Sequence, residues 1–151
     1  MKLVSSTGDF SFYVDSVAER VSCLSSSRFR YINLEQPKTL PELYEKGDSY
    51  KRLAESWAKA AEDANVTYVV SHAPSLHTPC LNLFRDPNDE TYRRNLRAIC
   101  NSIRICHELG IERIVVHACP DESFDKKQFY AYNERFTAIC SILRKNTASR
   151  S

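Results

Sequence analysis

Two histidines follow β-branched residues in two similar segments of the chain. Residues 69–74 read VVSHAP and residues 115–120 read VVHACP. Each segment predicts a strand that ends at its histidine, because the proline that follows cannot donate to a strand ladder. Two neutral imidazoles that meet at one point suit a divalent cation such as Zn²⁺, Mn²⁺ or Co²⁺. We therefore predict that His72 and His117 are metal ligands. The alternative is that each is a polar strand-end residue bonded to the backbone.

A second group of polar residues follows the segment YINLE at residues 31–35. Side chains alternate along a strand, so Asn33 and Glu35 share one face. A carboxylate at a strand end can act as an acid–base group, and we predict Glu35 as catalytic and Asn33 as substrate-binding. For Glu35 the alternative is an exposed strand-end charge. His77, in the segment after His72, is predicted to bind substrate, the alternative being a solvated side chain.

These residues are expected on a repeated strand–helix pattern. β-Forming residues predict strands, and apolar residues at helical spacing predict helices, in strict alternation. Asp48 and the pair at 86–87 are predicted helix starts, and Gly110 a helix stop. The predicted strands are residues 3–6, 31–35, 66–71 and 111–117, and the helical stripes are residues 13–24, 53–64, 96–109 and 129–143.

Such alternation predicts an α/β fold with parallel strands, either an open doubly wound sheet or a closed barrel. The chain has three glycines, and neither G-x-G-x-x-G nor G-x-x-x-x-G-K occurs. A nucleotide-binding doubly wound fold is therefore less favoured. A polar face that runs to the end of residues 31–35 favours a barrel with its site at the mouth.

Composition narrows the classes of partner. The chain has 151 residues and a formal net charge of +2, which gives no general attraction to nucleic acid. It has no apolar run of about 20 residues for a membrane span and no secretory signal, so the cytoplasm is the expected location. Its six cysteines form no C-x-x-C pair and are expected as free thiols. Residues 93, 94, 97 and 104 are arginines on a predicted helix, which is typical of a solvated face and only weakly of a nucleic-acid surface.

The segments VVSHAPSLH, YINLE and YRRNLRAICNSIRICHELGIERIVVHACP resemble the xylose-isomerase-like barrel superfamily. That superfamily includes sugar and sugar-phosphate isomerases and epimerases and the type IV apurinic endonucleases. The resemblance implies a (β/α)₈ TIM-barrel type of fold. It also implies a divalent metal (Mn, Zn, Co or Mg), a small sugar or sugar-phosphate substrate, and proton transfer beside a carbonyl.

The two branches of the superfamily imply different roles for the histidines. In the endonuclease-type branch, the histidines that end strands three and four are zinc ligands, and these positions correspond to His72 and His117 here. In the epimerase-type branch, the metal is held mostly by strands five to eight, and the two histidines line the sugar site. The balanced charge favours the isomerase or epimerase, because a nuclease must hold a polyanion.

The resemblance also sets an expectation for the extent of the fold. A full barrel has about 250 residues, and the polar segment TASRS at 147–151 has no strand signal. We therefore expect residues 1–151 to form one domain, the N-terminal half of a barrel with about four β/α units. Such a half-barrel lacks most of the family's metal ligands, so the metal is expected either on this chain or only on the complete barrel. Its exposed strand edges are ones that a homodimer would cover. The alternatives are an apurinic-site metallo-phosphodiesterase and a non-catalytic half-barrel.

Overall fold

The computed structural model of the chain describes residues 4–74 and 90–117 and, beyond them, residues 125–131, 133, 134, 137, 138 and 141. Within residues 4–117 the described part of the chain forms a four-stranded parallel sheet with three α-helices, and residues 126–131 are also helical. The strands are β1 (Val4–Ser6), β2 (Tyr31–Glu35), β3 (Thr67–His72) and β4 (Ile114–Val115). The helices are α1 (Val17–Ser22), α2 (Ser49–Asp63) and α4 (Glu90–Glu108), with 3₁₀ turns η1 (Thr7–Phe10) and η2 (Pro41–Leu43).

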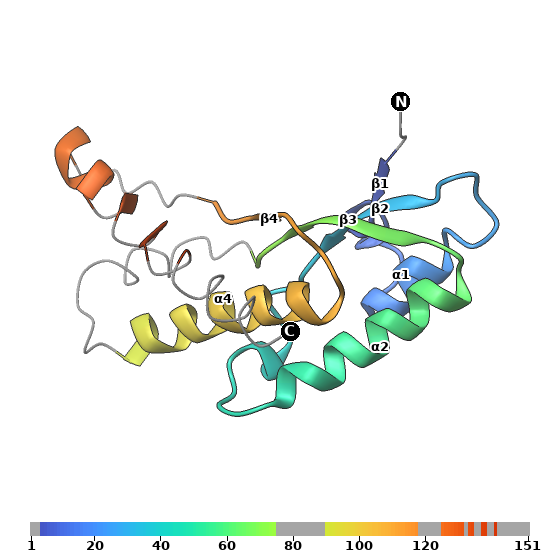
Figure 1. Cartoon of the computed structure of the whole chain (residues 1–151), viewed down its shortest axis with the longest axis horizontal. Coiled ribbons are helices and arrows are strands. Elements are labelled where there is room, and N and C mark those ends of the chain that lie inside the picture. The colour runs from blue at the N-terminus through green and yellow to red at the C-terminus, as the bar shows by residue number, and fades with distance from the viewer. Residues whose placement is uncertain are drawn as a thin grey trace.

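The strand order decides between the two predicted architectures. The order is β1-β2-β3-β4, and every neighbouring pair is parallel. Because crossovers are right-handed, a sheet that always advances in one direction carries its helices on one side. Figure 1 shows α1, α2 and α4 on the same side of the sheet. This is the arrangement of a barrel wall, whereas a doubly wound sheet reverses direction and has helices on both faces.

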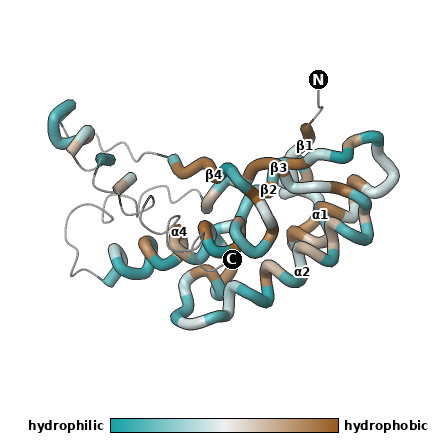
Figure 2. Tube along the Cα trace, in the orientation of Figure 1, coloured by the Kyte–Doolittle hydropathy of each residue, from teal (hydrophilic) through white to brown (hydrophobic). Residues whose placement is uncertain are grey.

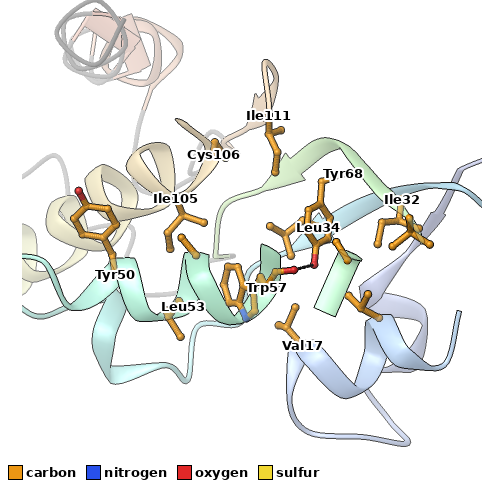
Figure 3. Close-up of a cluster of buried hydrophobic side chains, with 14 of the residues drawn as sticks. Val17, Ile32, Leu34, Tyr50, Leu53, Trp57, Tyr68, Ile105, Cys106 and Ile111 are labelled. Carbon is orange, nitrogen blue, oxygen red and sulfur yellow. Dashed lines mark hydrogen bonds between the residues drawn. The ribbon is translucent and has the colours of Figure 1, made fainter. Parts of the chain in front are cut away.

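The hydrophobic core lies between the sheet and these helices. Ile32 and Leu34 of β2 are fully buried there, with Trp57 of α2 and Ile105 of α4 (Figure 3). In Figure 2 the hydrophobic colour of β3 is confined to its middle, and α2 and α4 alternate between hydrophobic and hydrophilic turns. The helices therefore bury one stripe against the sheet and expose the other to water.

A buried hydrogen bond ties the sheet to α2. The Tyr68 hydroxyl donates to the Trp57 carbonyl oxygen over 3.0 Å (Figure 3). Burial raises the pKa of the Tyr68 phenol far above its usual value, so the hydroxyl keeps the proton that it donates.

One extra residue in β3 changes which side chains face the helices. Ile32 pairs with Tyr68, but the next residue, Asn33, pairs with Val70, so Val69 is an additional residue of the kind found in a β-bulge. Without it, strict alternation would place His72 on the same face as Tyr68. The bulge instead turns His72 to the opposite face, beside Glu35 in the register.

The boundaries of β2 and β3 agree closely with the sequence predictions, and those of the fourth strand do not. β2 spans the predicted residues 31–35, and β3 differs from its prediction by one residue at each end. The fourth strand was predicted too long, since only Ile114 and Val115 pair with β3.

The helix boundaries are also partly as predicted. Gly110 follows α4 with φ 66°, as predicted for a helix stop. The stripe predicted from Tyr13 is wrong at its start, because α1 begins at Val17. Ser16 and Glu19 form a capping box there, which leaves Tyr13 in a turn and 82% exposed.

Asp48 is the N-cap residue of α2, but its carboxylate accepts from Lys51 Nζ and makes no cap hydrogen bond. The predicted start at 86–87 lies outside the described residues.

Truncation of a side chain to alanine should lower the free energy of unfolding by different amounts on the two faces of the sheet. Leu34→Ala should lower the free energy of unfolding by about 2–5 kcal/mol, because it opens a cavity under the helices. Val4→Ala should lower it by less than about 1 kcal/mol, because Val4 is 46% exposed on the other face. Urea denaturation measures both values, and equal losses would contradict the one-sided core.

Candidate functional site

The sheet face opposite the helices, here called the open face, carries the predicted site residues. Glu35 and His72 end β2 and β3 and are register partners. His72 in turn pairs with Val115, two residues before His117, so His117 follows on the same face. Three predicted residues from three consecutive strands thus meet at the carboxyl ends of the strands. This is the edge at which barrel enzymes carry their chemistry.

The two imidazoles lie side by side. The His72 and His117 rings are stacked, with centroids 5.6 Å apart and an interplanar angle of 28°. His72 is half-buried and His117 is exposed. The prediction that these two histidines emerge together at one edge is confirmed.

Asn33 fixes the orientation of His72. Its Oδ1 lies 3.0 Å from His72 Nδ1, and its Nδ2 donates to Ser6 Oγ over 3.0 Å. Ser6 Oγ also accepts from the Gly8 backbone N–H. Because an amide oxygen can only accept, the proton of the neutral imidazole must lie on Nδ1. The lone pair of His72 is therefore on Nε2, the atom through which histidine commonly binds a metal.

Glu35 is held by the turn that follows β1. Its backbone N–H donates to Thr7 Oγ1 over 2.9 Å, and Thr7 is completely buried. The carboxylate lies against Gly8, where a Cβ atom would overlap Glu35 Oε2. A larger residue at position 8 would therefore displace the Glu35 carboxylate from this position.

The comparison with known protein families agrees with this arrangement. The description of the matching family is Xylose isomerase-like TIM barrel, and the match covers residues 27–147. The chain belongs to the xylose isomerase-like TIM barrel family. A comparison with curated proteins found no match.

Membership of the xylose isomerase-like family raises the question of a metal. In the described part of the chain, no three His, Cys, Asp or Glu side chains come close enough to hold an ion together. His72 and His117 fit such an ion as two nitrogen ligands, because they are neighbours and Asn33 leaves Nε2 of His72 unprotonated. Glu35 does not complete a three-ligand group with them.

The arginines of α4 have structural partners. Arg97 Nη1 donates to the Tyr44 carbonyl oxygen over 2.8 Å, and the Arg94 guanidinium lies 4.5 Å from the centre of the Tyr44 ring. Burial raises the pKa of the Tyr44 phenol, and the Arg94 charge lowers it by less. Arg104 lies over the ring of Tyr50. Arg97 and Arg104 are half-buried and contact Tyr44, before α2, and Tyr50, in α2, so a solvated face is wrong for these two, whereas Arg94 is exposed as predicted.

Three further sequence predictions concern His77, the cysteines and membrane-spanning helices. His77 lies outside the described residues, so its substrate-binding role stays a prediction. In the described part, Cys23, Cys100 and Cys106 are free cysteines, as predicted. No described helix combines the length and apolar character that crossing a membrane requires.

Sequence reasoning did not identify Ser6 and Gly8. Ser6 accepts a hydrogen bond from Asn33, and Gly8 leaves the space that the Glu35 carboxylate occupies. The signal that could have found them is the polar run at residues 5–8, where the first strand ends, since the carboxyl end of each barrel strand lies at the active-site face.

The Asn33 contact predicts one tautomer for His72. Nitrogen-15 NMR at about pH 8, above the usual imidazole pKa of about 6.5, should show a protonated Nδ1 and an unprotonated Nε2. Asn33→Leu should shift His72 toward a mixture of tautomers, because the acceptor is lost, while the exposed His107 stays unchanged. The same spectrum for His72 in both proteins would contradict the assignment.

Proposed function

We propose that this chain carries the proton-transfer part of a divalent-metal-dependent isomerase or epimerase that acts on a small sugar or sugar phosphate. The observation that supports it most is the grouping of one carboxylate and two imidazoles at the ends of β2, β3 and β4. Family membership agrees with it, because the family includes such enzymes.

In this proposal each residue has a distinct task. Glu35 takes the proton from the carbon beside the substrate carbonyl and, in an isomerisation, returns it to the neighbouring carbon, whereas an epimerisation needs a second acid on the opposite face of the substrate. His72 and His117 would hold the divalent ion through ring nitrogens, and Asn33 would keep His72 in the tautomer that this requires. This use of the two histidines is that of the endonuclease-type branch and departs from the epimerase-type branch, in which they line the sugar site. A bound ion polarises the carbonyl and hydroxyl oxygens of the substrate. Direct contact of Asn33 with substrate stays a prediction, since its amide already bonds to Ser6 and His72.

The arginines of α4 argue against a polyanionic substrate. A nuclease gains much of its affinity from cations that face the phosphate backbone. Two of the four arginines of α4, Arg97 and Arg104, are half-buried and donate hydrogen bonds to Tyr44 and Asn101 within the chain, which leaves fewer cations for a phosphate backbone.

The second candidate is an apurinic-site phosphodiesterase of the endonuclease type. The adjacency of His72 and His117, with ring centroids 5.6 Å apart, favours it, because that branch uses the histidines of strands three and four as zinc ligands. Chelator-sensitive cleavage of abasic DNA is the activity that it predicts.

Exchange of substrate hydrogen for deuterium tests the leading proposal. The chain is incubated in D₂O with Mn²⁺ and a panel of ketoses, aldoses and their phosphates, and proton NMR follows the C–H beside the carbonyl. Exchange should occur with at least one sugar and should slow by about 10²–10⁴-fold in Glu35→Gln, because the base is lost.

Glu55→Gln is the matched control, because Glu55 is an exposed carboxylate of α2 away from the site. It should exchange at the wild-type rate. Absence of exchange with Mn²⁺, Zn²⁺, Co²⁺ and Mg²⁺ alike would overturn the isomerase proposal.

A further inference from the structure

A buried amide lies directly beneath the open-face site, on the helix side of the sheet. Gln36 follows Glu35 and is only 1% exposed. Its Nε2 lies 3.0 Å from Ser71 Oγ, 3.3 Å from the Ser102 carbonyl oxygen and 3.8 Å from Cys106 Sγ. The side chain therefore joins the end of β3 to two residues of α4.

The direction of these hydrogen bonds is determined by the partners. A carbonyl oxygen can only accept, so the amide nitrogen of Gln36 faces Ser102. The Ser71 hydroxyl donates to the Leu34 carbonyl oxygen over 3.0 Å and so accepts from Gln36. The result is a chain of bonds from Gln36 through Ser71 to the backbone of β2.

Gln36 also contributes through its backbone. Its N–H donates to the His72 carbonyl oxygen over 3.1 Å. This is the hydrogen bond between β2 and β3 that lies next to the site. Main chain and side chain of one residue thus hold His72 and Ser71, two neighbours on opposite faces of β3.

The buried amide has no advantage as a space-filling group. Gln36 Oε1 is buried, and no described residue hydrogen-bonds to it. An apolar side chain of similar size would fill the volume without leaving a buried acceptor unsatisfied. The contribution of the amide must therefore come from the direction of the bonds that its nitrogen makes.

Those bonds select the register that the bulge at Val69 creates. In this register Ser71 faces α4 and His72 faces the site. A slip of one residue would exchange the two faces, which would remove the Ser71 hydroxyl from Gln36 and turn His72 toward the core.

The helix that Gln36 contacts also leads to His117. Cys106 of α4 accepts a hydrogen bond from the Ile111 backbone N–H through its carbonyl oxygen, over 2.8 Å, and β4 follows directly. Burial raises the pKa of the Cys106 thiol to about 11, so the group beside Gln36 stays uncharged. Gln36 is thus joined to the elements that carry Glu35, His72 and His117.

We propose that Gln36 is a positioning residue: by clamping Ser71 and α4 on the helix side, it holds His72 on the open face, beside Glu35 and His117. The inference rests on the proposed function, in which these three residues form the site. Gln36 itself contacts neither substrate nor metal.

The test compares Gln36→Leu with Asn101→Leu. Asn101 is also a buried amide, 1% exposed, but it belongs to α4 and bonds to the Leu43 and Glu45 carbonyl oxygens, away from the strand ends. Both variants should lower the melting temperature. Carbon-13 NMR of labelled histidine rings, assigned by single His→Gln variants, then reports on the site directly.

In Gln36→Leu the ring signals of His72 and His117 should move or split, whereas those of the exposed His107 should stay in place. In Asn101→Leu all three should stay in place. Ser71→Val should reproduce the effect of Gln36→Leu, and Ser71→Thr, which keeps the hydroxyl, should not. Unchanged His72 and His117 signals in Gln36→Leu, or equal changes in Asn101→Leu, would overturn the positioning role.

Titration with Co²⁺ separates this inference from the function on which it rests. Gln36→Leu should weaken Co²⁺ binding about tenfold, as the loss of an outer support of a metal ligand does, and Asn101→Leu should not. If the wild-type chain binds no Co²⁺, the proposed metal site fails, and the ring signals still decide the role of Gln36.

Discussion

The site depends on the single extra residue that β3 carries at Val69. A strand that alternated strictly after Tyr68 would turn His72 toward α2 and α4 and would expose Ser71. The bulge reverses both: Ser71 enters the core side, and His72 joins Glu35 on the open face. Bulges of this kind commonly lie beside active sites, where they re-aim a side chain.

The open face carries polar side chains because the helices cover only the other side of the sheet. Since α1, α2 and α4 all lie on one side of the sheet (Figure 1), the apolar residues of β2 face them and the polar residues face away. The polar residues then satisfy one another. Ser6, Asn33 and His72 form a hydrogen-bonded row across three neighbouring strands, and the His117 ring stacks on its end. Such a row gives the functional groups fixed positions before any ligand arrives.

The sequence predicted what depends on local pattern. Alternation in residues 31–35 identified the two faces of β2, and the β-branched residues before each histidine placed His72 and His117 at strand ends. The family resemblance, drawn from the same segments, is confirmed by the match over residues 27–147.

What the sequence could not predict depends on contacts between distant residues. Val69 and Val70 are equally good strand formers, so nothing local marks one of them as extra. Asn33 and His72 are 39 residues apart, and only the sheet register brings them together. Arg97 donates a hydrogen bond to Tyr44, which lies 53 residues before it in the sequence. Because no local pattern marks such a contact, the sequence alone predicts a solvated face for the arginines of α4. Whether residues 1–151 correspond to one half of a barrel stays a prediction.

In the proposed site, neighbouring strands present two imidazoles to one divalent ion, and X-ray absorption on the Zn²⁺-loaded chain detects those ligands directly. We expect nitrogen scatterers at about 2.0–2.1 Å, with the multiple scattering of two imidazole rings. His72→Ala and His117→Ala should each reduce this to one ring. A spectrum with oxygen ligands alone, or with the sulfur distance of about 2.3 Å that thiolate gives, would contradict it.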